Sequence, residues 1–321
     1  MSYESVDIPI RGSSIVKKLN LADSVSKQKF VMLIDKDNVI RNAATLLSNE
    51  MGALTYEPEA CIADSPVLPS DYDEISAECE RILNAKLSEN DKQNLDAIFA
   101  AGASSGGARP KVFAKIDGED WIVKFPSSID SKEIGRQEYE YNQCAKKCGL
   151  TVNDFALLPS KKCAGYFATK RFDRNYLGSC RVLMASASAL LKTSHRIPNL
   201  DYNTLCLLTL QLTKNSSEVE KLFRLMCFNV FSHNRDDHSK NFSWLYDEKN
   251  SQWILSPAYD LTYSNSISGE HATTISGEGK NPTIENILEV AAKNGIKKSK
   301  ARKIAESVKA IVKEQLGEWL S

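Results

Sequence analysis

Hydrophobic and polar positions change their spacing along this chain, and the change predicts two kinds of structure. Up to about residue 173, short apolar runs alternate with Gly, Pro and polar turns, as in strands and short helices. Beyond about 185, apolar residues recur mostly at helical spacing. We therefore expect an α+β fold with two lobes, a small mixed α/β lobe followed by a larger, mainly helical one.

The same pattern assigns individual elements. Strands are expected over 29–34, 111–116, 121–125 and 165–174, with a turn at DGED between the second and third. Helices are expected over 41–50, 75–87, 132–149, 200–214, 217–231, 284–295 and 300–320. Ser217 and Glu220 have the spacing of a capping box at a helix start. The domains we expect are 1–45, of unclear role, 46–173 and 174–321.

Composition excludes some classes of protein. Lys plus Arg and Asp plus Glu each number 41, so the formal net charge is zero and no overall field attracts nucleic acid or anionic lipid. The start lacks the pattern of a signal peptide, and no apolar run approaches the ~18 residues of a membrane span. The eight cysteines include no CxxC pair. We expect a cytoplasmic protein without membrane contact and with free thiols.

The densest polar chemistry lies at 229–246, NVFSHNRDDHSKNFSWLY, between a predicted helix and a predicted strand. Arg235, Asp236 and Asn241 have the spacing R-D-x-x-x-x-N of the protein-kinase catalytic loop. In such a loop the Asp accepts a proton from the substrate hydroxyl and the Asn holds magnesium. The alternative is that these residues form only a solvated loop. Against it, Asp260 in PAYDL follows this loop at the position where kinases have a further Asp that binds magnesium.

Upstream residues extend this pattern. Lys124 ends the strand WIVK, as a phosphate-binding Lys does in kinases. Glu138 in the next helix is the best candidate for the ion-pair partner of Lys124, and Glu140 and Glu133 are the next candidates. The Gly-rich run SSGGARPK before the strands could offer backbone N–H groups to phosphate. Ala108 stands where a Walker A loop requires Lys, and GxGxxG is absent, so neither a P-loop nor a dinucleotide site is supported.

In combination and order, MGALTYEP, SSGGARPK, WIVKFPS, Glu138, KRFDR, NRDDHSKNF and PAYDL resemble the HipA-type serine/threonine kinases, toxins of bacterial toxin–antitoxin modules. The resemblance covers roughly residues 45 to 265. It implies a two-lobed, protein-kinase-like HipA fold, with ATP and Mg²⁺ as cofactors. The early part of the chain also resembles a shortened, HipT-like form of the family.

Roles follow from the resemblance residue by residue. Asp236, as the base, and Lys124 would be the catalytic residues. Asn241 with Asp260 would hold magnesium. Autophosphorylation would fall on Ser104 or Ser105. The implied ATP-binding residues are Gly106, Gly107, Ala108, Arg109, Lys111, Lys124, Lys170, Arg171, Phe172, His238, Lys240, Asn241, Tyr259 and Asp260.

Partners are also implied by the resemblance. The family phosphorylates aminoacyl-tRNA synthetases, its members bind an antitoxin of HipB type and through it operator DNA, and a shortened form would use a separate HipS-like small protein. Two other classes remain open: an ATP-binding scaffold for antitoxin and DNA, and a small-molecule kinase. The basic segment KNGIKKSKARK could meet tRNA or an acidic partner, or form the solvated face of a helix pair.

Overall fold

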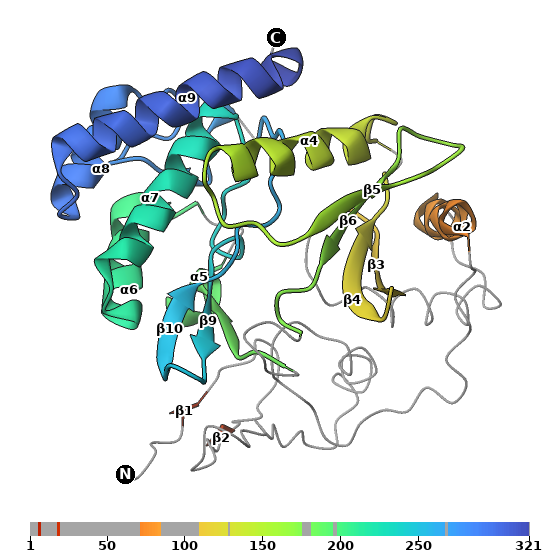
Figure 1. Ribbon diagram of the computed structural model, residues 1–321, viewed down its shortest axis with the longest axis horizontal. Helices are drawn as coiled ribbons and strands as arrows, with labels where there is room; N and C mark the ends of the chain where they lie inside the picture. The colour runs from red at the N-terminus through yellow and green to blue at the C-terminus, as the bar shows by residue number, and fades with distance from the viewer. Residues whose placement is uncertain are drawn as a thin grey trace. The chain divides into compact units, whose positions relative to one another are not determined.

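The computed structural model describes residues 6–7, 18–19, 71–84, 109–127, 129–174, 181–194, 198–266 and 269–320 (Figure 1). The chain divides into two compact units. The sheet unit comprises Met1–Gly135 and Leu157–Leu183, and the helical unit comprises Arg136–Ala156 and Met184–Ser321. The elements expected over 29–34 and 41–50 lie outside the described residues, and the domain limits predicted at 45 and 173 stay predictions.

A four-stranded sheet dominates the sheet unit, with strand order β3-β4-β6-β5. Its strands are β3 (Lys111–Ile116), β4 (Glu119–Lys124), β5 (Phe155–Leu158) and β6 (Tyr166–Lys170). Asp117 and Gly118 form the β3–β4 turn with φ of 50° and 80°, the backbone that a two-residue hairpin requires. Because this turn is so tight, β4 starts two residues earlier than predicted, inside DGED. A two-residue ladder joins β1 (Val6–Asp7) and β2 (Lys18–Leu19).

Helix α2 (Tyr72–Asn84) and the sheet share one apolar core. Ile75 and Cys79 come from the helix, and Val112, Val123 and Phe125 from the sheet strands and the residue after β4. Burying such side chains stabilises the unit by about 1.5 to 3 kcal/mol each. The helix starts three residues before the predicted position.

Asp73 anchors the first turn of α2. Its carboxylate accepts hydrogen bonds from the hydroxyls of Ser160 (2.6 Å) and Tyr166 (2.8 Å) and from the Lys161 amide (2.9 Å). The Ser160 hydroxyl, followed by the Lys161 amide, lowers the pKa of Asp73 to about 2. The ionised carboxylate therefore ties the helix to the segment between β5 and β6.

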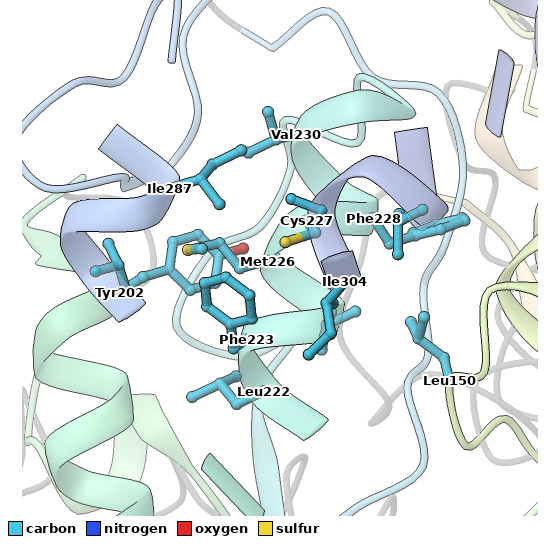
Figure 2. Close-up of a cluster of buried hydrophobic side chains, with 14 of the residues drawn as sticks. Leu150, Tyr202, Leu222, Phe223, Met226, Cys227, Phe228, Val230, Ile287 and Ile304 are labelled. Atoms are coloured by element: carbon cyan, nitrogen blue, oxygen red, sulfur yellow. The ribbon is translucent and has the colours of Figure 1, made fainter. Parts of the chain in front are cut away.

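The helical unit is built around α7 (Ser216–Phe231), which packs against α6 (Tyr202–Thr213) and α9 (Lys298–Leu320). The unit also contains α4 (Ile134–Lys147), most of which belongs to it, together with α5 (Ala187–Leu190) and α8 (Ile284–Lys293). Side chains of α6, α7, α8 and α9 meet in one cluster, and Figure 2 shows Tyr202, Phe223, Met226, Ile287 and Ile304 among them. The helical periodicity of the sequence thus gives one continuous core.

Two small sheets interrupt the helices. Strands β7 (Met184–Ser186), β9 (Ser243–Asp247) and β10 (Gln252–Leu255) form one sheet, and β8 (Leu200–Asp201) pairs in parallel with β11 (Thr273–Thr274). Strand β9 was predicted, whereas β7, β8 and β11 were not, because two or three residues carry no periodicity. No helix in the described ranges has the length and apolar composition needed to cross a bilayer.

The capping box predicted at Ser217 and Glu220 is wrong. Helix α7 begins one residue earlier, and its N-cap is Asn215, whose side chain accepts the Ser217 amide at 3.0 Å. Glu220 instead pairs with Lys300 of α9 at 2.5 Å. Asn and Ser are comparably strong N-caps, and the extended backbone of Asn215, with φ of −135° and ψ of 114°, makes Asn215 the cap.

Candidate active site

The stretch from Asn234 to Phe242 connects α7 to β9 within the helical unit. Helix α7 ends at Phe231, and His233 then takes a left-handed backbone with φ of 53°. From there, buried and accessible residues alternate: Asn234, Asp237 and Ser239 are buried, whereas Asp236 and Lys240 are exposed. The predicted helix–loop–strand arrangement is therefore present.

Asp236 and Asn241 lie together, as their spacing predicted. The Asn241 side-chain amide donates to the Asp236 carbonyl at 2.8 Å, and its backbone amide donates to His238 at 2.9 Å. The Asp236 side chain is 63% exposed, with the His238 ring nitrogen 3.9 Å from its carboxylate. These bonds turn the Asn241 amide nitrogen toward the loop, and its oxygen is the atom that a hard cation would use.

Asp260 lies on a neighbouring segment that is hydrogen-bonded to this loop. The Asn234 side chain donates to the Asp260 carbonyl at 3.5 Å and to Asn229 at 3.0 Å. Asp260 has a left-handed backbone with φ of 53°, a strained conformation that is frequent at functional sites. Next to it, the Tyr259 hydroxyl contacts the Lys240 carbonyl (2.5 Å) and the Ser243 hydroxyl (2.7 Å), and burial raises its pKa.

The described residues contain no group of three or more His, Cys, Asp or Glu side chains that could hold a metal ion by themselves. Magnesium bound to a nucleotide needs less from the protein, since phosphates and water supply most of its oxygen ligands. One carboxylate, Asp260, and one amide oxygen, Asn241, have the chemistry of such a partial site. The donor set therefore fits the predicted ion.

Asp237 is the residue that sequence reasoning missed. Its side chain is fully buried and accepts hydrogen bonds from the Tyr202 hydroxyl (2.8 Å) and the Thr273 amide (3.2 Å). His271 Nδ1 lies 3.0 Å from the same carboxylate, and the Thr273 hydroxyl donates to the Asp237 carbonyl at 2.6 Å. Burial, with Asp237 as the next cause, raises the pKa of Tyr202 well above its ordinary value. Asp237 thus fixes the buried side of the loop to the helical unit.

In the sheet unit, Lys124 is the last residue of β4 and faces Lys111 of β3 across the ladder. Its ammonium lies 5.7 Å from the Phe167 ring. Arg109 precedes β3 and contacts Asp130 at 3.2 Å. Cations therefore lie at this end of the hairpin, as expected for a phosphate-binding edge.

The predicted adenine-contacting segment follows β6. Lys170 pairs with Glu119 at 3.2 Å. Arg171 is buried, contacts Asp173 through two nitrogens at 2.8 and 2.9 Å, and stacks 4.1 Å from the Phe113 ring. Its backbone amide donates to the Asp120 carbonyl at 2.7 Å. Contacts of this segment, including buried Phe172, with a nucleotide remain predictions.

Glu138 is 2% exposed on α4, a helix of the helical unit. Lys124 belongs to the other unit, so their ion pair stays a prediction. The second candidate, Glu140, contacts Arg136 at 3.0 Å and the Trp319 indole at 2.7 Å. The remaining predicted residues, Ser104, Ser105, Gly106, Gly107 and Ala108, lie outside the described residues.

A family model, a curated relative and solved structures are similar to this chain. The model of the HipA-like C-terminal domain matches residues 103–316. A protein of Sinorhizobium fredii (strain NBRC 101917 / NGR234) named "Putative kinase Y4dM" is 26% identical over 155 residues, 45% of this chain and 37% of that protein. The chain therefore matches well under half the length of this curated relative.

The fold is shown by one of the solved structures that resemble this chain. HipA of Shewanella oneidensis MR-1, solved in a complex with HipB and its operator DNA, matches with a TM-score of 0.65 and 16% identity over 89% of this chain and 72% of that chain. The Helicobacter pylori proinflammatory kinase CtkA matches with a TM-score of 0.44 and 14% identity, over 66% of this chain and 89% of that chain. The predicted two-lobed HipA fold is confirmed. Because the family model spans well over half of the sequence, the chain belongs to the family of HipA-like C-terminal domain proteins.

Proposed function

We propose that this chain is an ATP- and Mg²⁺-dependent protein serine/threonine kinase. The observation that carries the proposal is the pairing of an exposed carboxylate, Asp236, with Asn241 across a 2.8 Å hydrogen bond, on a loop tied to the Asp260 segment. A base must reach the substrate hydroxyl, and the metal ligands must lie beside it, so one loop has to carry both. The HipA fold supports the same reading.

The proposed reaction transfers the γ-phosphoryl group of ATP. Asp236 accepts the proton of a serine or threonine hydroxyl, the hydroxyl oxygen bonds to the γ-phosphorus, and the bond to the leaving ADP oxygen breaks. Asn241 and Asp260 would hold magnesium, which neutralises charge on the phosphates when bound. Lys124, Arg109, Lys111 and the run Gly106–Ala108 would contact phosphates. Lys170, Arg171, Phe172, His238, Lys240 and Tyr259 would line the rest of the nucleotide site.

Regulation and partners belong to the proposal as well. Phosphorylation of Ser104 or Ser105 would add about two negative charges to the phosphate-binding loop and oppose ATP binding. HipA of Shewanella oneidensis was solved with HipB and operator DNA. That complex supports an antitoxin of HipB type as a partner here, with DNA reached through it and a HipS-like protein as a further candidate. An aminoacyl-tRNA synthetase is the proposed substrate.

The test uses γ-labelled ATP and a bacterial lysate, with wild type, Asp236→Asn and a matched control, Asp117→Asn. Asp117 lies in the exposed β3–β4 turn, where Asn is also favourable. We expect labelled protein bands from wild type and the control, and none from Asp236→Asn. Labelled small molecules would instead identify a small-molecule kinase, and no label from wild type would favour an ATP-binding scaffold.

A further inference from the structure

The helical unit contains an open cavity of about 620 Å³ behind the catalytic loop. It lies between the end of α7, one face of α9 and the segment from His271 to Pro282. Its apolar lining comes from Val230 and Phe231 of α7 and from Val312 and Leu320 of α9. We call this cavity the basic groove because of the charged residues that surround its apolar floor.

Among the described residues that line the basic groove, one is Arg and three are Lys: Arg235, Lys280, Lys309 and Lys313. Among the described residues that line it, none is Asp or Glu. Carboxylates that contact lining residues include Glu278, which accepts the backbone amides of Lys280 and Asn281 at 2.7 and 3.0 Å, and the buried Asp237, whose carboxylate lies 3.0 Å from His271 Nδ1. In a chain whose formal net charge is zero, this is a local concentration of positive charge over an apolar floor.

We propose that the basic groove docks an acidic segment of a protein partner, with one apolar side chain of that segment on the floor. If the partner is the substrate of the kinase, this proposal rests on the proposed function. The positive charge of the groove favours a negatively charged partner. The apolar lining residues favour a peptide with an apolar side chain over a nucleic acid. The Lys309 ammonium lies 5.8 Å from the centre of the Phe231 ring, a cation–π contact that covers one face of this ring and leaves less of it for a base to stack on.

Arg235 connects the groove to the chemistry. It lines the groove and immediately precedes Asp236. Its backbone is held on both sides, by the Ser264 carbonyl at 3.3 Å and the Ala272 amide at 3.1 Å, and its guanidinium donates to Asn265 at 2.6 Å. A partner segment in the groove is therefore anchored one residue from the proposed base, on a part of the chain that is fixed.

The direct test is the binding of a short fluorescein-labelled peptide of alternating Asp and Glu around one Leu, measured by fluorescence anisotropy without ATP. The double variant Lys309→Glu/Lys313→Glu reverses two exposed charges one helical turn apart on α9. We expect its affinity to fall at least about tenfold. The control, Lys297→Glu/Lys303→Glu, makes the same change in net charge near the start of α9, outside the lining, and should change affinity less than about twofold.

Two further arms distinguish groove binding from general attraction. A peptide of Lys residues around one Leu should bind the Lys309→Glu/Lys313→Glu variant better than wild type, a gain that an unfolded variant could not give. Replacing the Leu by Ser in the acidic peptide should weaken binding to wild type. Equal effects of both double variants, or no dependence on the Leu, would overturn the proposal, as would tighter groove-dependent binding of an RNA oligonucleotide of equal charge.

These results separate the groove from the kinase assignment. Peptide binding at the groove without any transfer of labelled phosphate would leave the docking surface standing and refute the proposed function. Phosphate transfer that depends on Asp236, with no binding of the acidic peptide, would support the proposed function and refute the docking surface.

Discussion

The two sides of the loop from Asn234 to Phe242 differ in what holds them. On the exposed side, Asp236 and Asn241 are held by bonds within the loop itself, chiefly from Asn241 to Asp236 and His238. On the buried side, Asp237 is held by Tyr202, His271 and Thr273, about 35 residues before and after it. Adjacent aspartates are thus given opposite environments.

This difference separates chemistry from scaffold. A base must remain accessible to substrate, and the Asp236 side chain is 63% exposed. The neighbouring Asp237 carboxylate is buried and hydrogen-bonded, and it fixes the backbone that carries the base. The comparison predicts that changes on the buried side reduce stability and that changes on the exposed side reduce activity.

The largest effect on stability is expected from Asp237→Ala. It removes the acceptor of the Tyr202 hydroxyl and the Thr273 amide and leaves both donors buried. We expect the free energy of unfolding to fall by about 3 to 5 kcal/mol, measured by urea denaturation. A loss below about 1 kcal/mol would mean that this carboxylate does not hold the loop.

Tyr202→Phe should have a smaller effect of the same kind. The change keeps the ring in the core but removes a hydroxyl that donates to Asp237 and accepts from Asn229 at 3.0 Å. A loss of about 1 to 2 kcal/mol is expected. The matched control is Tyr246→Phe on β9, a half-buried tyrosine whose ring packs against Trp253, where we expect less than about 0.5 kcal/mol. Equal losses at both positions would argue against a special role for the Tyr202 hydroxyl.

Lys240→Ala probes the exposed side and should leave stability within about 0.5 kcal/mol of wild type. Only the Lys240 backbone carbonyl is used in the bond from Tyr259, and the substitution retains it. If the side chain contacts nucleotide as proposed, the KM for ATP rises by about threefold to tenfold. An unchanged KM would remove Lys240 from the nucleotide site.

Local signals in the sequence predicted the exposed side well. The spacing of Asp236 and Asn241 lies within a few residues, so it could be read directly, and the end of α7 and the start of β9 followed from periodicity. The buried side could not be predicted, since nothing in the sequence relates Asp237 to Tyr202, His271 and Thr273. The β8–β11 pairing and the packing of α6 bring Tyr202, His271 and Thr273 to the buried side of the loop.

The cap of α7 shows the same limit at short range. Asn215 and Ser217 are both strong capping residues, and only the backbone geometry before Ser216 selects Asn215. The ion pair that the sequence predicts between Lys124 and Glu138 stays a prediction, because the two residues belong to different units.

The most direct test of the central comparison measures Asp236→Asn and Asp237→Asn side by side, for both urea unfolding and transfer of labelled phosphate. We predict that Asp236→Asn unfolds within about 0.5 kcal/mol of wild type and transfers phosphate about 10² to 10⁴ times more slowly. The free energy of unfolding of Asp237→Asn should be clearly lower than that of wild type. If Asp236→Asn keeps the wild-type rate of transfer, the assignment of the base is wrong.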